Sequence, residues 1–220
     1  MILVVAATPI EMKPFQTLLQ EEKLSCEILV IGVGPVETAV RLTKFLSDTR
    51  EVITSVLVFG IGGAYIQPLQ EKQARILDIC LASQEILGDF GISNPDKLEY
   101  LPPSLTGDIV YPMDTHLIYD CRQILYKNKV KTMEGPFITV NGASGSRMRG
   151  EMLRKKWQGL CENMEGAAVA RVCREFDLPC VELRCISNMV ENRNITNWRV
   201  AEACDKAAIA AILTVKGLMG

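Results

Sequence analysis

Short apolar runs alternate with amphipathic segments along the whole 220-residue chain. Continuous or alternating apolar residues predict strands at 2–7, 26–31, 53–59, 74–82, 131–141 and 180–188. Four-residue spacing of apolar side chains and cap residues predict helices from Thr8 onward and over 37–46, 114–127, 163–176 and 198–218. This alternation indicates one domain over 1–220, an α/β sandwich of three layers (αβα) around a mainly parallel sheet.

The first strand runs directly into Thr8-Pro9-Ile10-Glu11, a capping-box sequence with proline at the first helical position. A helix cap alone would explain Glu11, because its carboxylate can accept a hydrogen bond from the Thr8 amide. A strand-to-helix junction of an α/β sheet also lies at the edge where ligands bind, so the same carboxylate is a candidate for a site.

The strand at 180–188 carries charge where a sheet interior is normally apolar. Its alternation places Glu182, Arg184, Ile186 and Asn188 on one face. Buried charges must be paired or must serve a ligand, and we interpret Glu182 as a structural ion-pair partner. Arg184 and Asn188 approach the carboxyl end of the strand, which favours a binding site.

Segments of small residues follow three of the predicted strands. Gly32-Val33-Gly34 predicts a turn before the helix at 37–46, with Val36, Val40 and Phe45 as its core positions. These two glycines lack the third of a dinucleotide fingerprint. In the segment Gly60, Ile61 and Gly62 the glycines have no side chain, which would let backbone N–H groups come close to a ligand or to water. An ordinary tight turn explains this segment equally well.

The region 88–112 is polar and rich in proline and glycine, and it is the longest stretch without a predicted element. Long irregular segments in compact domains are often lids or partner contacts. We therefore expect it to cover the site or to meet another subunit.

Composition excludes several classes of partner. The formal charge is −2, the pI is near 5.6, and the longest basic cluster is Arg154-Lys155-Lys156, so we expect no nucleic acid. No apolar run approaches the roughly 20 residues of a membrane span and the amino terminus lacks a signal pattern, which predicts a cytoplasmic protein. Eight scattered cysteines and one histidine predict buried thiols and no metal site.

Four separated segments resemble the nucleoside phosphorylase/nucleosidase superfamily in order and spacing. They are 8–11, 32–36, 60–63, and Met164-Glu165-Gly166 continuing to Ser187-Asn188. The resemblance covers nearly the entire chain and implies that superfamily's mixed, mainly parallel sheet. Residues 162–168, Ser187-Asn188, Arg193 and Trp198 look most like the futalosine hydrolases, which remove hypoxanthine from futalosine in an alternative route to menaquinone.

The resemblance implies a role for each carboxylate. Glu11 occupies the place of the group that orients the attacking water, and Arg184 helps to hold that water. Glu165 accepts hydrogen bonds from the ribose hydroxyls, and Met164 packs beneath the sugar. A carboxylate suits a vicinal diol and a thioether fills an apolar gap, and no cofactor or metal is implied.

The same resemblance assigns Ala143, Ser144, Ser187 and Asn188 to the purine. Asn188 stands where related nucleosidases carry an aspartate that protonates the base, and an amide cannot do so. It can donate to N7 and O6 of a 6-oxopurine, or donate to N7 and accept from the 6-amino group of adenine, so this residue leaves the base open. Ala143 replaces an aromatic ring that stacks on the purine in the nucleosidases.

Other functions remain open on sequence alone. They are an adenine-releasing methylthioadenosine/adenosylhomocysteine nucleosidase, a phosphorylase using Arg41 and the Gly60–Gly63 segment for phosphate, and a non-catalytic nucleoside-binding protein. Arg193, Arg147 or a second subunit are candidates for reading the 5′ substituent. The resemblance implies a homo-oligomer that binds a small purine nucleoside.

Overall fold

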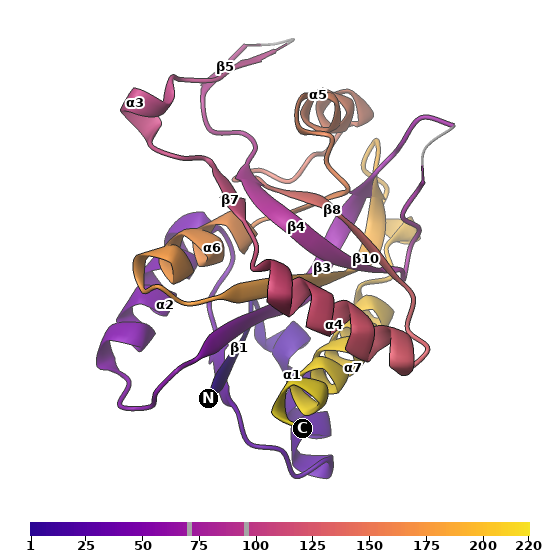
Figure 1. The fold of residues 1–220 in the computed structure, drawn as a ribbon. Coiled ribbons are helices and arrows are strands. Elements are labelled where there is room, and N and C mark those ends of the chain that lie inside the picture. The colour runs from indigo at the N-terminus through magenta and orange to yellow at the C-terminus, as the bar shows by residue number, and fades with distance from the viewer. Residues whose placement is uncertain (70–71, 95–96) are drawn as a thin grey trace.

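The computed structural model describes residues 1–69, 72–94 and 97–220, which form a sandwich of helices around one mixed sheet (Figure 1). Eight strands make up this sheet: β1 (Ile2–Ala6), β2 (Glu27–Val30), β3 (Ser55–Tyr65), β4 (Ile79–Leu87), β7 (Val110–Pro112), β8 (Thr132–Thr139), β9 (Cys161–Asn163) and β10 (Cys180–Val190). A separate short pair is formed by β5 (Ile92–Ser93) and β6 (Leu98–Glu99).

Helices cover the sheet in two groups. One group packs together and consists of α1 (Pro9–Glu21), α4 (Thr115–Lys127) and α7 (Val200–Met219). The second contains α2 (Pro35–Asp48) and α6 (Gly166–Glu175), which contact each other on the other side of the sheet (Figure 1). The helix α5 (Arg147–Trp157) packs on β3 and β8, and the single turn α3 (Pro103–Thr106) stands apart.

The predicted mixed, mainly parallel sheet is confirmed. β1 pairs in parallel with β2 and β3, β3 with β10, β4 with β8, and β8 with β9. The pairs β10–β4, β3–β9 and β4–β7 are antiparallel. Because β9 pairs back onto β3, the strands β3, β10, β4, β8 and β9 close into a ring from which β1 and β2 extend.

The core follows the apolar pattern of the sequence. Leu3, Val4 and Val5 in β1 are fully buried, as expected for a strand covered on both faces. The capping box of α1 forms as predicted, with Thr8 and Glu11 exchanging side-chain to backbone hydrogen bonds. All eight cysteines are free thiols, and every one except Cys26 is buried.

Three predicted boundaries are wrong, and the corrections affect the site. The helix predicted from Asn163 begins at Gly166, because 161–163 form β9. Gly60, Ile61 and Gly62 are not a loop but the continuation of β3, paired with β10. The strand predicted at 74–82 lies five residues later, as β4 starts at Ile79.

The prediction of Val36 and Val40 as core residues is also wrong. Their side chains are 76% and 60% exposed, whereas Thr38 and Leu42 of α2 are buried and Phe45 is partly buried against the core. The helix thus turns a small polar residue and a leucine inward and leaves two valines in solvent. Of the segment 88–112, which the sequence predicts to cover the site or to meet another subunit, residues 95–96 lie outside the described residues.

Candidate functional site

A cavity of about 310 Å³ lies beyond the ends of β1 and β2 and along the second halves of β3 and β10. Its volume falls in the range of small-molecule sites. Of the predicted site residues it brings together Glu11, Ile61, Gly62, Ala143, Ser144, Met164, Glu165, Arg184, Ser187 and Asn188. Segments from the two ends of the chain therefore meet at one place.

Gly60 is the predicted site residue that does not line this cavity, and it serves the site indirectly. A Cβ at Gly60 would come within 2.5 Å of Glu11 Oε1 and 2.9 Å of Arg184 Nη1. No side chain fits there unless these groups move. The glycine therefore allows Glu11 and Arg184 to approach each other across β3.

Glu11 is 5% exposed, and both of its carboxylate oxygens accept hydrogen bonds. One oxygen, Oε2, accepts from the Thr8 amide at 3.0 Å and from the Thr8 hydroxyl at 2.7 Å. The other, Oε1, accepts from the Ile61 amide at 3.1 Å. The helix cap therefore also fixes a carboxylate that lines the cavity.

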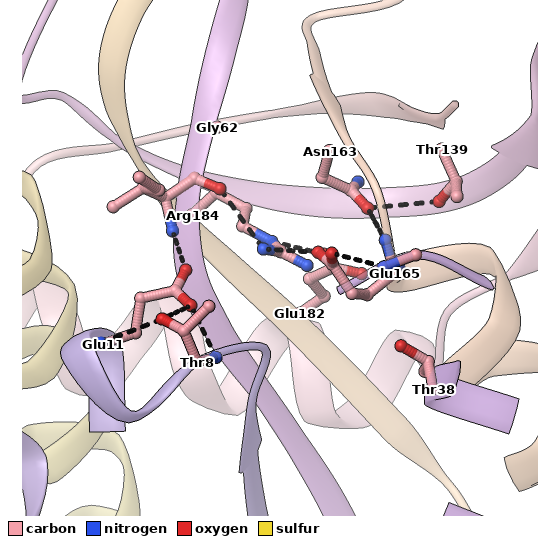
Figure 2. A network of polar contacts seen from close by, with 12 residues as sticks. Thr8, Glu11, Thr38, Gly62, Thr139, Asn163, Glu165, Glu182 and Arg184 are labelled. Carbon is pink, nitrogen blue, oxygen red and sulfur yellow. Dashed lines mark hydrogen bonds and ion pairs between the residues drawn. The ribbon is translucent and has the colours of Figure 1, made fainter. Parts of the chain in front are cut away.

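Arg184 forms the centre of a buried charge cluster (Figure 2). Its Nε donates to Glu182 at 2.7 Å, and Nη1 lies 3.3 Å from Glu165 and donates to the Ile61 carbonyl at 3.2 Å. Burial alone would lower the pKa of the guanidinium, but Glu182, Glu165 and Glu11 raise it above its ordinary value. Glu182 is fully buried, which confirms its interpretation as a structural ion-pair partner.

Glu165 is held at the junction of β9 and α6 (Figure 2). Its amide and that of Gly166 both donate to Asn163 Oδ1, at 2.9 and 2.8 Å, and its carboxylate accepts from the Gly34 amide at 3.2 Å. Burial raises the pKa of Glu165, while Arg184 and the Gly34 amide oppose that rise. The carboxylate is thus fixed from both sides and lines the cavity.

Another buried carboxylate, that of Glu85, holds the Asn163 side chain in place. Glu85 accepts from Asn163 Nδ2 at 2.5 Å and from the Thr139 hydroxyl at 2.7 Å. Burial and the neighbouring Glu182 raise the pKa of Glu85 well above its usual range. This network connects β4, β8 and β9 to the loop that carries Glu165.

Ser187 and Asn188 both line the cavity although they are adjacent in a strand. The register of β10 against β3 slips between Ile186 and Asn188, and this bulge disrupts the strict alternation predicted for the strand. The Ser187 hydroxyl lies 2.8 Å from Asn188 Oδ1, and Asn188 Nδ2 donates to the Met189 carbonyl at 3.2 Å. The amide is therefore fixed in one orientation.

Several cavity residues escaped the sequence reasoning. They are mainly apolar side chains, together with one carboxylate: Ile10, Val33, Val140, Glu162, Val200 and Cys204. Glu162 directly precedes the Asn163-Met164-Glu165 motif, and its position in the three-residue strand β9 orients it toward the cavity. Burial raises the pKa of Glu162, and hydrogen bonds from Ser144 and Tyr65 oppose the rise.

The other arginines considered from the sequence are placed differently. Arg41 is half-exposed on α2 and paired with Glu37, and Arg147 is paired with Glu151 on α5. Neither lines the cavity. Arg193 lies over the ring of Trp198, 5.9 Å from its centroid, and Trp198 does line it.

Among the described residues that line the cavity, Arg184 is the single cation, and the carboxylates are those of Glu11, Glu162 and Glu165. The described part of the chain contains no cluster of three or more His, Cys, Asp or Glu side chains arranged to hold a metal ion. Its helices include none with the length and apolar content of a membrane span. No described residue of 88–112 reaches the cavity.

Comparison with known proteins identifies the family and the fold of this chain. A futalosine hydrolase of Thermus thermophilus is 28% identical over 186 residues, covering 83% of this chain and 77% of that protein. The structure of a futalosine hydrolase of Helicobacter pylori superimposes with a TM-score of 0.83 at 20% identity, covering 98% of this chain and 97% of the other, and shows a common fold. Residues 7–218 match the Phosphorylase superfamily. The chain belongs to this superfamily.

Proposed function

We propose that this protein is a nucleosidase that hydrolyses the N-glycosidic bond of futalosine and releases hypoxanthine. One observation carries the proposal: two fixed carboxylates, Glu11 and Glu165, line the same cavity on either side of Arg184. The similarity to futalosine hydrolases over most of the chain supports the choice of substrate.

The ribose would lie between the two carboxylates. Glu165 is held by Arg184 and the Gly34 amide and has acceptor capacity left for the two hydroxyls of a ribose. Met164 lines the cavity next to it and offers an apolar surface to the sugar. These contacts would place the anomeric carbon within reach of a water held by Glu11.

Glu11 would orient this water and accept its proton as oxygen bonds to the anomeric carbon. The bond to purine nitrogen breaks with its electron pair leaving on the base, so the sugar passes through an oxocarbenium-like state, as in other glycoside hydrolyses. The excess of carboxylates around the cavity stabilises this positive charge. Asn188 would stabilise the departing base by donating a hydrogen bond.

A phosphorylase is less well supported by the same geometry. Phosphate needs a cationic cradle, and the single cation among the described cavity residues already pairs with Glu182 and Glu165. Arg41, the other candidate, is paired with Glu37 away from the cavity. A bound anion would have to lie among carboxylates.

We expect the purified protein to release hypoxanthine from futalosine equally fast with and without phosphate. Chromatography of the products with futalosine, methylthioadenosine and inosine tests this directly. Adenine released from methylthioadenosine with futalosine left intact would instead favour the adenine nucleosidase. A requirement for phosphate would contradict hydrolysis, and binding without turnover of any nucleoside would favour the non-catalytic alternative.

We also propose that the protein works as a homo-oligomer. Four exposed apolar residues lie at the cavity or on α2: Ile10 and Val33 line the cavity, and Val36 and Val40 are on α2. A second copy would cover these side chains and narrow the open end of the cavity. We expect Val36→Asp with Val40→Asp to give a folded monomer in light scattering. A wild-type protein that is monomeric at micromolar concentration would contradict the proposal.

A further inference from the structure

Glu162 is the cavity-lining carboxylate to which the proposed reaction assigns no task. Glu162 is 7% exposed. One carboxylate oxygen, Oε1, accepts from the Ser144 amide at 2.8 Å, and the other, Oε2, accepts from the Tyr65 hydroxyl at 3.1 Å. Each carboxylate oxygen has two acceptor positions, so both retain capacity for a further donor. A buried acceptor of this kind on a cavity wall suits a ligand N–H group.

Glu162 lies opposite Asn188 across a single glycine. In the sheet Gly63 of β3 pairs with Glu162 of β9 on one side and with Asn188 of β10 on the other. A Cβ at Gly63 would lie 3.1 Å from Asn188 Nδ2 and 3.6 Å from Glu162 Cγ, so both side chains lie on the same face. The missing side chain leaves a space bordered by Glu162, by the Asn188 amide and by Val190 Cγ2, which would lie 3.0 Å from that Cβ.

The hydrogen bonds of Asn188 determine which amide group faces this space. Its Oδ1 lies beside the Ser187 hydroxyl and its Nδ2 donates to the Met189 carbonyl. Turning the amide over would put Oδ1 against that carbonyl oxygen and forfeit the bond. The second N–H of Nδ2 is therefore the group available to a ligand.

We propose that Glu162 and Asn188 together read the edge of a 6-oxopurine, with Glu162 accepting from N1–H and Asn188 donating to O6 or N7. This assignment rests on the proposed function, which makes the ligand a purine nucleoside. It makes Glu162 a specificity-determining residue and selects hypoxanthine over adenine.

The two bases differ at the positions that this pair contacts. Hypoxanthine carries a donor at N1 and an acceptor at O6, which match Glu162 and Asn188 in turn. Adenine carries an acceptor at N1, which an ionised carboxylate repels, and a 6-amino donor where hypoxanthine has O6. Both bases can accept the Asn188 N–H at N7, so Glu162 is the member of the pair that distinguishes them. A site that matches one edge leaves buried polar groups unpaired with the other.

A purely structural role for Glu162 is the competing explanation, because its bond to Ser144 also anchors the loop at 141–146. Asp89 provides a matched comparison. Its carboxylate accepts from the amides of Asn141 and Gly142 and pairs with Arg149, so it anchors the same loop. Asp89 does not line the cavity.

Calorimetric binding of hypoxanthine and adenine to the wild type, Glu162→Gln and Asp89→Asn separates the two roles. We expect the wild type to prefer hypoxanthine by about tenfold or more and Glu162→Gln to lose most of this preference. Asp89→Asn should weaken both bases by the same factor. Equal weakening of both bases in Glu162→Gln would overturn the assignment.

A probe that changes only the ligand covers the case in which Glu162→Gln does not fold. The wild type should bind 1-methylhypoxanthine, which lacks the N1–H donor, about tenfold or more weakly than hypoxanthine. Equal affinity for the two would overturn the assignment while leaving futalosine hydrolysis untouched. Binding of neither purine by the wild type would contradict the proposed function as well.

Discussion

Glu11→Gln should reduce the turnover of futalosine by roughly 10²–10⁴-fold while leaving nucleoside binding nearly unchanged. The amide keeps the size of the side chain but cannot accept a proton from water. Glutamine is also accepted at this position of a capping box, so α1 should keep its cap. Its Nε2 cannot accept from the Ile61 amide as Glu11 Oε1 does, so we expect a loss of about 1–3 kcal/mol of stability. Single-turnover release of hypoxanthine, calorimetric binding of futalosine and thermal unfolding measure the three quantities.

The control for this prediction is Thr8→Ala, which removes the hydroxyl from the same capping box but retains the carboxylate. It should cost about 1 kcal/mol of stability, as loss of an N-cap typically does, and keep far more activity than Glu11→Gln. Wild-type turnover in Glu11→Gln would remove Glu11 from the mechanism and leave it only as a helix cap.

Much of the cavity could be predicted because its residues stand at the ends of elements with clear patterns. Glu11 lies in a capping box after an apolar strand, and Arg184 and Asn188, like Glu182 and Ser187, are polar residues in a strand that is mostly apolar. In an α/β fold such positions gather at one edge of the sheet. Their roles came from the resemblance, because neither pattern distinguishes a catalytic carboxylate from a cap.

Neither the role of Glu162 in the cavity nor the bulge at Ser187 could be predicted from the sequence. β9 has three residues, too few to show a period of two, and its place is set by pairing with β3 and β8. The glycines at 60–63 suggested a loop because glycine weakens a strand. Only the three-dimensional structure shows that Glu11 and Arg184 occupy the space that Gly60 leaves open.

The valines of α2 show a limit of periodicity itself. Val36 and Val40 have helical spacing, but spacing gives an apolar stripe without saying what covers it. In the single chain this stripe is exposed, and the core side of α2 is formed by Thr38 and Leu42. An apolar stripe on a helix is equally consistent with a core and with a subunit interface.

Arg184→Met should destabilise the protein by about 3–5 kcal/mol near neutral pH, because it leaves buried carboxylates without their cation. Arg184 is 2% exposed and pairs with Glu182, which is fully buried, and with Glu165. Methionine fills a similar apolar volume, so the loss of charge should dominate over the loss of packing. Urea unfolding followed by fluorescence of the two tryptophans measures the difference.

The pH dependence of this loss identifies its electrostatic origin. Burial already raises the pKa of Glu165 and Arg184 opposes that rise, so the variant should raise it further. A folded-state pKa above the unfolded value gives stability that is present below the unfolded pKa and is lost as pH rises through the folded pKa. The difference between wild type and variant should therefore shrink from pH 7 toward pH 5. The double variant Arg184→Met with Glu182→Gln should recover part of the stability at pH 7, since it removes one of the two buried carboxylates that lose their cation. A loss that is independent of pH and unchanged in the double variant would show that Arg184 acts through packing alone.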